Sequence, residues 1–329
     1  MTSSAASSSS SAPAPLRVVF MGTPELACAS LAALLAAPAI EVVAAVTQPD
    51  RPKGRDLKLQ PSPVKAMAEA AGIPVLQPQQ AREAAFLEEV KRLQPDLIAV
   101  AAYGQLLPQE LVDLPRHGCL NVHTSLLPRY RGAAPIQWAI LNDDAETGVT
   151  IMKLDAGLDT GAILSQKSTP ISPLDTAETL HDRLAGLGAR LLVETIPPYV
   201  AGQLQPRPQP AAGVVYAPKI KKTDGLIDWN QPARSIWNRV RGLRPWPGAY
   251  TWVEDGHGRH LLKLWEAEPI TRTGEGPPGR VLEAGKEGII VACGQNALRI
   301  TELQREGGRR LSAREYLAGH PVITGCRLG

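Results

Sequence analysis

The sequence predicts an α/β fold: a Rossmann-like, doubly wound and mostly parallel sheet, followed by a small OB-like β-barrel domain. The chain of 329 residues is long enough for two domains. Apolar, strand-like runs alternate with helical stretches as far as about residue 204, as in repeated βα units. Beyond a Pro-rich segment, short strand-like runs follow one another across Gly-rich turns, which is typical of a barrel.

The first domain is expected over residues 16–204. It opens with a buried strand from Arg17, a tight turn at Gly22 and a helix entered at Pro24. That turn holds one glycine in place of the fingerprint Gly-x-Gly-x-x-Gly, which argues against NAD binding. Later strands are expected at residues 41–47, 74–76, 97–102, 119–123, 147–153 and 162–166, and helices at 63–72, 80–94, 135–141 and 174–203.

Two further segments precede and join the domains. Residues 1–15 are Ser/Ala-rich, carry no charged side chain and are expected to be disordered. Residues 205–222 form a Pro-rich, basic linker that we expect to be extended and semi-rigid. The second domain, residues 223–329, is predicted to contain a helix near 233–241 and five strands, at 249–253, 261–265, 279–282, 288–292 and 297–300.

Composition narrows the class of protein. The four cysteines, Cys28, Cys119, Cys293 and Cys326, form no Cys-x-x-Cys pair, and the six histidines lack metal-ligand spacing. We therefore expect neither disulfides nor a bound metal, and a cytoplasmic location fits. No apolar run approaches the length of a transmembrane helix, and the basic and apolar regions of a secretory signal are missing.

Charge is distributed unevenly along the chain. Residues 1–204 carry a net charge of −4, whereas residues 205–329 carry +7. A basic second domain suggests a polyanionic partner. A solvated basic surface without any partner is the alternative, and charge by itself does not decide between the two.

The strand expected at residues 119–123 carries the best candidates for chemistry. Asn121 and His123 stand two residues apart, so they point to the same face of the strand. The chain then enters a loop rich in Pro and Gly that also carries Arg129 and Arg131. Open α/β sheets bind ligands at this carboxyl edge. A packed histidine and a turn-forming asparagine are the ordinary alternatives.

A carboxylate is the third candidate group. Asp155 and Asp159 both lie in the turn between the strands expected at 147–153 and 162–166, and either of them could simply cap that turn. A carboxylate can also orient an imidazole and keep it protonated. An amide, a protonated imidazole and a carboxylate would suit acyl-type transfer, because two donors face a developing oxyanion.

Two motifs in the chain resemble the folate-dependent formyltransferases. They are Asn-Val-His-Thr-Ser-Leu-Leu-Pro-Arg-Tyr-Arg-Gly-Ala-Ala-Pro at 121–135 and Gly-Leu-Asp-Thr-Gly at 157–161. The longer form is most similar to the branch of the family whose acceptor is methionyl-tRNA, and the resemblance covers about residues 17–329. It implies transfer of the formyl group of 10-formyltetrahydrofolate to the α-amino group of methionyl initiator tRNA, for translation initiation, by a monomer that needs no metal.

The resemblance also implies roles for individual residues. Asn121 and His123 would stabilise the oxyanion, and Asp159 would be the charge partner of His123, because it has the family position within Gly-Leu-Asp-Thr-Gly. The segment Ser125, Leu126, Leu127 and Pro128 would lie along the folate. Core packing is the alternative for the two leucines.

A tRNA acceptor would need basic contacts. The long loop at residues 48–63 carries Arg51, Lys53, Arg55 and Lys58, and the family has a basic insertion here that enters the acceptor arm of the tRNA. This chain departs from that pattern at Asp56 and Leu57. The basic C-terminal domain would also bind tRNA, and Lys219, Lys221 and Lys222 add charge at its start. A solvated, mobile loop is the alternative for residues 48–63.

Three other kinds of formyltransferase or hydrolase share the Asn/His/Asp set: those acting on glycinamide ribonucleotide, those acting on sugar nucleotides, and the 10-formyltetrahydrofolate hydrolases. The basic loop, the continuation Ala-Ala-Pro-Ile at 133–136 and the basic second domain favour tRNA over these acceptors. A non-enzymatic RNA-binding protein on the same fold is a further alternative, which the presence of Asn121, His123 and Asp159 opposes.

Overall fold

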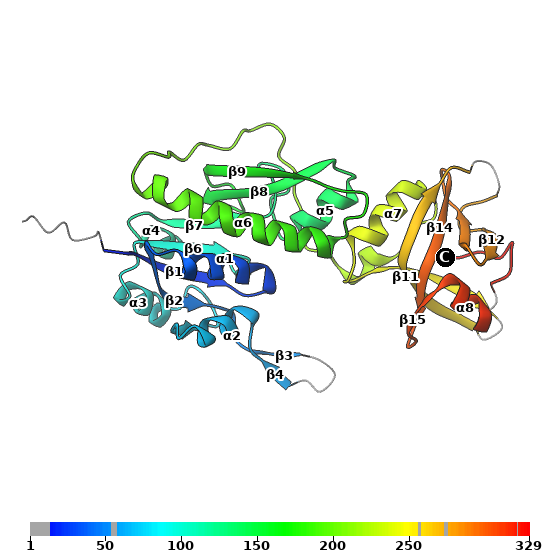
Figure 1. The fold of residues 1–329 in the computed structure, drawn as a ribbon, viewed down its shortest axis with the longest axis horizontal. Coiled ribbons are helices and arrows are strands. Elements are labelled where there is room, and N and C mark those ends of the chain that lie inside the picture. The colour runs from blue at the N-terminus through cyan, green and yellow to red at the C-terminus, as the bar shows by residue number, and fades with distance from the viewer. Residues whose placement is uncertain (1–13, 54–57, 256–257, 273–275, 321) are drawn as a thin grey trace, which may run out of the picture. The chain divides into compact units, whose positions relative to one another are not determined.

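The computed structural model describes residues 14–53, 58–255, 258–272, 276–320 and 322–329 (Figure 1). The chain divides into two compact units, each of which is built from three separate segments of the chain. One comprises Met1–His123, Ile151–Ala156 and Gly188–Pro206, and the other Thr124–Thr150, Gly157–Leu187 and Arg207–Gly329. Most of the Ser/Ala-rich tail predicted at residues 1–15 lies outside the described residues. The domain bounds inferred from the sequence remain a prediction.

A seven-stranded sheet of strand order β5-β2-β1-β6-β7-β8-β9 forms the base of the α/β fold. Its strands are β1 (Leu16–Gly22), β2 (Ile40–Val46), β5 (Val75–Leu76), β6 (Leu97–Ala101), β7 (Cys119–His123), β8 (Glu146–Lys153) and β9 (Ile163–Pro170). The pairs β1–β2, β1–β6, β2–β5 and β6–β7 are parallel. The predicted Rossmann-like, mostly parallel sheet is therefore confirmed.

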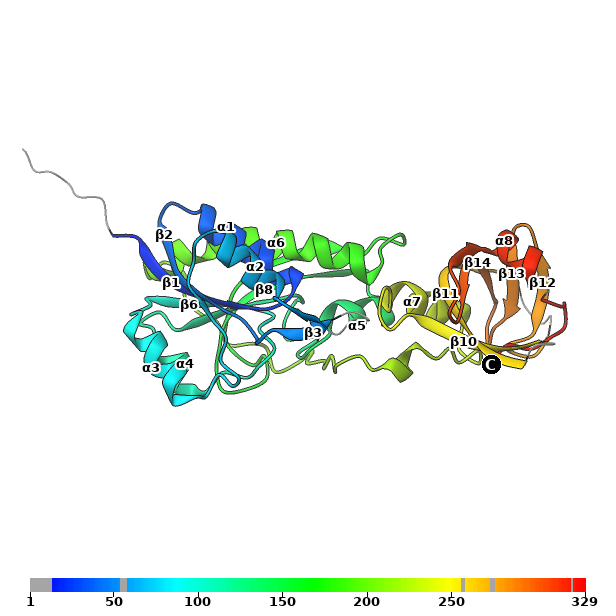
Figure 2. The ribbon, with the colours of Figure 1, turned by 90° about the horizontal axis from the view of Figure 1, so that it is seen from below.

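Helices cover both faces of the parallel strands. Figure 2 shows α1 (Glu25–Ala36) and α2 (Pro63–Ala70) on one side of these strands and α3 (Ala84–Arg92) and α4 (Gln109–Asp113) on the other. Every residue of β6 is buried, which explains its uninterrupted apolar sequence. Because helices cover both faces of this sheet, a ligand can reach it at the ends of the strands.

The second unit contributes α5 (Pro135–Leu141) and α7 (Ala233–Gly242), while α6 (Ala177–Val200) supplies residues to both units. Proline occupies the first turn of α5, where its missing N–H costs no hydrogen bond. Helices α5 and α7 pack together. A small apolar cluster joins them, and it consists of Ala134, Ile220 and Leu243 with Trp138 and Leu141 at its margin.

The C-terminal part forms a separate six-stranded antiparallel sheet of order β10-β11-β14-β13-β12, with β15 paired to β14. Its strands are β10 (Ala249–Asp255), β11 (Gly258–Ile270), β12 (Val281–Gly285), β13 (Gly288–Ala292), β14 (Ala297–Arg305) and β15 (Arg310–Ser312), followed by α8 (Ala313–Gly319). Figure 2 shows α8 beside β12, β13 and β14. The five predicted strands are present, and β15 is a sixth that the sequence analysis missed.

A second missed element is the hairpin of β3 (Arg51–Lys53) and β4 (Lys58–Gln60), which lies within the loop predicted at residues 48–63. At its base, Asp50 accepts hydrogen bonds from Lys65 at 2.7 Å and Gln77 at 2.8 Å. These hydrogen bonds hold the pKa of Asp50 below its usual value. The predicted loop is thus in part a hairpin, anchored where it leaves the domain.

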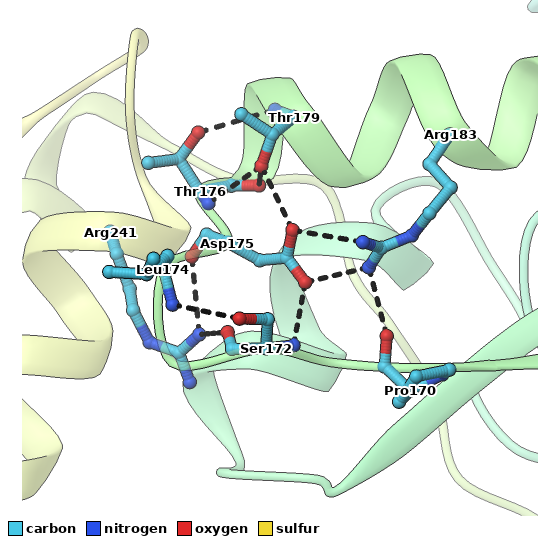
Figure 3. A network of polar contacts seen from close by, with 8 residues as sticks. All are labelled: Pro170, Ser172, Leu174, Asp175, Thr176, Thr179, Arg183 and Arg241. Atoms are coloured by element: carbon cyan, nitrogen blue, oxygen red, sulfur yellow. Dashed lines mark hydrogen bonds and ion pairs between the residues drawn. The ribbon is translucent and has the colours of Figure 1, made fainter.

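Asp175 is the centre of a polar network that ties α7 to the segment before α6 (Figure 3). Its carboxylate accepts hydrogen bonds from Arg183 at 2.6 Å and from the backbone N–H of Ser172 at 2.6 Å. Burial raises the pKa of this carboxyl, but the Arg183 and Ser172 donors outweigh that effect and lower it.

Arg241 connects this network to α7. Its Nη1 donates to the carbonyl oxygens of Ser172 and Asp175, each at 3.2 Å, and its Nε donates to Asn238 at 2.9 Å. The guanidinium lies 4.3 Å from the ring of Trp237. Only 6% of Arg241 is exposed. A buried guanidinium is tolerated here because carbonyl, amide and aromatic groups surround it.

We predict that Arg241→Met lowers the free energy of unfolding by about 2–4 kcal/mol, because the buried carbonyl of Asp175 loses this donor and the half-buried carbonyl of Ser172 loses one of its two. Urea denaturation of the purified protein measures this loss. Arg234→Met is the matched control, because Arg234 also stacks on Trp237 and pairs with Asp143 but is largely exposed. An exposed pair contributes about 1 kcal/mol or less. Equal losses in the two variants would contradict the prediction.

Candidate active site

Asn121 and His123 lie at the end of β7, within the first unit. Asn121 is opposite Val100 of β6 in the parallel register, and it is half-buried. His123 is the last residue of β7 and is only 6% exposed. The two side chains share one face of the strand, since they are separated by one residue. β7 therefore brings an amide and an imidazole to the carboxyl edge of the sheet.

A cavity lies at the same edge, and the sequence analysis did not single it out. Its volume is about 310 Å³, and its lining residues are Gln80, Ala81, Arg82, Gln105, Leu106, Leu107 and Pro108. These residues follow the ends of β5 and β6, and the carboxyl ends of parallel strands meet at one edge. Leu106 is 77% exposed. An exposed leucine in a concavity of this size suits an apolar ring of a ligand.

The loop after β7 begins the second unit and contains the predicted folate-binding residues. The buried hydroxyl of Thr150 on β8 donates to the carbonyl of Ser125 at 2.7 Å and accepts from the N–H of Leu127 at 3.1 Å. Gln166 on β9 donates to the same hydroxyl and to the carbonyl of Leu127, each at 2.9 Å. Leu127 is buried, while Leu126 and Pro128 are half-buried. Side chains of β8 and β9 therefore hold the shape of this loop.

Asp159 lies in the turn between β8 and β9, also in the second unit. Its φ is +51°, a left-handed conformation that costs a non-glycine residue about 1–2 kcal/mol. Its Oδ2 accepts a hydrogen bond from the N–H of Gly132 at 2.8 Å. Asp159 is half-buried, whereas Asp155 is exposed. Gly157 permits this turn, because a Cβ there would lie 1.9 Å from the hydroxyl of Thr160.

Arg129 and Arg131 both make contacts that stabilise the fold of the second unit. Nη2 of Arg129 donates to both carboxylate oxygens of Asp144, at 2.8 and 2.9 Å. Nε and Nη2 of Arg131 donate to Oε1 of Gln209, at 3.1 and 2.8 Å. Both arginines therefore bind side chains of the second unit itself, which supports a structural role for them.

The basic residues predicted to meet tRNA fall into two groups. Arg51, Lys53 and Lys58 belong to the hairpin β3–β4, in the first unit, where Arg51 is exposed and donates to Gln48 at 2.8 Å. Arg55, like Asp56 and Leu57, lies outside the described residues. The second group, Lys219, Lys221 and Lys222, is exposed on the segment that leads into the C-terminal part of the second unit.

The described part of the chain contains no cluster of three His, Cys, Asp or Glu side chains that could hold a metal ion. Within the same residues, no helix combines the length and apolar character needed to cross a membrane.

Comparison with known proteins agrees with the architecture and the motifs. The Formyl transferase family profile matches residues 16–196, and the profile of the Formyl transferase C-terminal domain matches residues 219–321. The chain belongs to the formyl transferase family.

Within that family the chain groups with the methionyl-tRNA formyltransferases. It is 52% identical over 314 residues to the methionyl-tRNA formyltransferase of Citrifermentans bemidjiense, covering 95% of this chain and 96% of that protein. It is 51% identical over 316 residues to that of Geobacter sulfurreducens, covering 96% and 98%. The resemblance inferred from the motifs is confirmed.

Solved structures share the fold at lower identity. An N-formyltransferase from Helicobacter canadensis, in complex with folinic acid and dTDP-3-aminofucose, has a TM-score of 0.64 and 20% identity, over 87% of this chain and 99% of that one. HypX from Aquifex aeolicus, in complex with tetrahydrofolic acid, has a TM-score of 0.58 and 18% identity. That match covers 95% of this chain and 50% of HypX, so this chain spans about half of HypX.

We predict that Thr150→Val lowers the free energy of unfolding by about 2–3 kcal/mol, because buried groups of Ser125 and Leu127 lose their hydrogen-bond partner. Urea denaturation measures the effect. Thr147→Val is the matched control on the same strand, since the hydroxyl of Thr147 is buried and has no partner among the described residues. The control should be neutral or stabilising, and a loss as large as that of Thr150→Val would refute the role given to Thr150.

Proposed function

We propose that this protein transfers the formyl group of 10-formyltetrahydrofolate to the α-amino group of methionyl initiator tRNA, for translation initiation. The observation that carries the proposal is the identity of about one half to methionyl-tRNA formyltransferases over nearly the whole chain, which includes both matched domains. The amide and imidazole at the end of β7 supply groups suited to this chemistry. The cytoplasm remains the prediction for its location, and a monomer remains the prediction for its oligomeric state.

The reaction exchanges one amide for an amine. The α-amino group attacks the formyl carbon, and negative charge develops on the formyl oxygen. The bond from the formyl carbon to N10 of the folate then breaks, while one proton leaves the attacking amine and one is taken up by N10. No nucleophile from the protein is needed, so the protein must stabilise the oxyanion and provide a path for the proton.

We assign the stabilisation of the oxyanion to Asn121 and His123, both of which can present an N–H donor from the same face of β7. A well-placed donor of this kind contributes about 3–4 kcal/mol to the transition state. Asp159 is assigned as the charge partner of the protonated His123 and as the base in the path of the proton. The exposure of Asp155 supports the choice of Asp159.

We place the folate at the carboxyl edge of the sheet. The cavity lined by Gln105, Leu106 and Leu107 offers an apolar wall with amide groups beside it. Ser125, Leu126, Leu127 and Pro128 are proposed to lie along the same cosubstrate. Leu127 is buried, and its N–H and carbonyl are bonded to Thr150 and Gln166. We therefore expect the half-buried side chains of Leu126 and Pro128 to be the groups of this segment that meet the ligand.

The acceptor is assigned to the basic surfaces. The hairpin includes Arg51, Lys53 and Lys58, and the segment before the C-terminal part includes Lys219, Lys221 and Lys222; these are residue types suited to phosphate contacts. The net charge of +7 over residues 205–329 supports a polyanionic partner for the C-terminal part. Arg55 belongs to the same proposal by its sequence position.

The first experiment is a direct assay of transfer. The purified protein is incubated with 10-formyltetrahydrofolate and methionyl initiator tRNA, and formyl-methionine is measured, with free methionine and uncharged tRNA as controls. Formylation of the charged tRNA alone supports the proposal. Consumption of the folate without formylated tRNA would refute it in favour of a hydrolase or a small-molecule acceptor, and binding of tRNA without turnover would favour a non-enzymatic RNA-binding protein.

We predict that His123→Ala lowers kcat by about 10²–10³, because one donor to the oxyanion is lost. The affinity for 10-formyltetrahydrofolate, measured by calorimetry, should change by less than about threefold, since the donor acts mainly in the transition state. His181→Ala is the control, because His181 lies on α6 and pairs with Asp182. A His123→Ala enzyme with near-parental kcat would disprove the assignment.

We predict that replacing Lys219, Lys221 and Lys222 together by glutamine weakens tRNA binding and reduces the slope of log affinity against log salt by about 2–3, one unit for each lost phosphate contact. Filter binding at several salt concentrations measures this slope. Lys167→Gln, on β9, is the control, and folate affinity should not change in either variant. An unchanged salt slope in the triple variant would exclude these lysines from the tRNA interface.

A further inference from the structure

Gln209, in the Pro-rich segment that leads to the C-terminal part, binds the turn that carries Asp159. Its Nε2 donates to the carbonyl oxygens of Asp159 and Gly161, each at 2.8 Å. Its Oε1 accepts from Nε and Nη2 of Arg131, at 3.1 and 2.8 Å. The side-chain amide thus uses both of its donors and both of its acceptor positions.

The chemistry of the partners fixes the orientation of this amide. Carbonyl oxygens only accept hydrogen bonds and a guanidinium only donates them, so the nitrogen of Gln209 must face Asp159 and Gly161 while the oxygen faces Arg131. The opposite orientation would place oxygen against oxygen and nitrogen against guanidinium. A glutamate at this position would keep the contact with Arg131 and lose both donors to the turn.

Backbone hydrogen bonds hold the segment in place on both sides of Gln209. Arg207 and Ile163 exchange two hydrogen bonds of 2.8 Å at the start of β9. Further along, the N–H of Arg131 donates to Val215 at 2.9 Å, and that of Ala217 donates to Arg131 at 2.7 Å. Gln209 therefore projects from a segment that is fixed at both ends, which lowers the entropy lost when its side chain is ordered.

The turn needs such support because Asp159 has a left-handed backbone conformation. Two hydrogen bonds hold Asp159 from opposite ends of the residue: Gly132 donates to its carboxylate and Gln209 to its carbonyl. Gly132 is itself constrained, with φ of +120° and space for no Cβ, since one would lie 2.7 Å from the carbonyl of Ala217. The direction of the Asp159 carboxylate thus depends on residues 207–217 of the segment.

We propose that Gln209 is a positioning residue for catalysis: it fixes the turn from which Asp159 presents its carboxylate to the reaction. This inference rests on the proposed function, in which Asp159 acts on the proton. Gln209 itself does not touch the reacting atoms. Its expected effect is therefore on turnover and not on the binding of either substrate.

The test compares kcat and KM in two variants of Gln209. Gln209→Leu removes the whole amide, and Gln209→Glu keeps the acceptor for Arg131 but removes both donors to the turn. Both should lower kcat by about tenfold or more, since a displacement of about 1 Å in a reacting group is enough for such losses. The KM values for 10-formyltetrahydrofolate and for methionyl-tRNA should stay within about threefold of the parent.

Gln205→Leu is the matched control in the same segment. Gln205 is exposed, and its Nε2 donates to the nearby carbonyl of Gly202 at 2.9 Å. Its kcat should equal that of the parent. A Gln209→Glu enzyme with parental kcat would overturn the proposal, because the donors would then be dispensable. A rise in KM for the tRNA at unchanged kcat would also overturn it, since Gln209 would then serve acceptor binding.

Asp159→Asn separates this inference from the proposed function. If Asp159→Asn is inactive and Gln209→Leu retains parental kcat, the role of Asp159 stands and that of Gln209 fails. If Asp159→Asn keeps parental kcat, the assignment of Asp159 fails, and the proposal for Gln209 fails with it. Loss of kcat in all three variants, with parental KM values, supports both.

Discussion

The side-chain amide of Gln209 binds two carbonyl groups of the turn at residues 157–161, those of Asp159 and Gly161, and the candidate active site depends on this contact. Buried backbone groups must find hydrogen-bond partners, and in loops side chains can supply them. Gln209 supplies two donors to this turn, and Gly132 supplies one to the carboxylate of Asp159. The loop after β7 has the same arrangement, with Thr150 between Ser125 and Leu127. In both cases a loop of the candidate site obtains its shape from polar groups that are distant in sequence.

This dependence explains which parts of the site could be predicted. Periodicity and turn residues identified β7 and the turn between β8 and β9, because the information is local to Asn121, His123 and the glycines around Asp159. Family motifs then selected Asp159 over Asp155. Gln209 could not be found in this way, since it lies 50 residues from Asp159 and no local pattern marks a glutamine in a Pro-rich segment as a hydrogen-bonding partner.

The missed strands have a related physical cause. β3, β4 and β15 are three residues each and rich in charged side chains, so they show neither alternation nor an apolar run. Pairing alone defines them, β3 with β4 and β15 with β14. The longer strands of both sheets were predicted because at least one of their faces is buried. Among strands, the sequence therefore predicted those that contribute to a core and missed those that only extend a sheet edge or form a hairpin. The short helices α4 and α8 were also missed, although each buries residues in a core.

Arg241 on α7 makes hydrogen bonds to the segment that precedes α6, so α7 is bound to that segment by more than chain connectivity. Burial lowers the pKa of its guanidinium, with the neighbouring charge of Arg234 acting in the same direction, so the position is electrostatically costly. Lysine could not replace it, because a single ammonium cannot donate to Ser172 and Asp175 from one end while Nε binds Asn238. The fork of arginine satisfies all of these acceptors, which ties α7 to the segment that precedes α6.

The residues proposed to catalyse formyl transfer and those proposed to select the acceptor are different, because they recognise different parts of the substrates. In the proposed mechanism the donors to the oxyanion act on the formyl group, which every formyl transfer shares. The role assigned to Asn121 and His123 therefore does not distinguish one acceptor amine from another. The fold is likewise common: a neighbour whose structure contains dTDP-3-aminofucose has a TM-score of 0.64 to this chain at 20% identity. Discrimination must therefore come from surfaces away from the formyl carbon, and the basic residues 205–329 are the largest charged part available. Gln209 shares its segment with Lys219, Lys221 and Lys222, so under the proposed function residues 205–222 contribute both to acceptor binding and to the shape of the turn that carries Asp159.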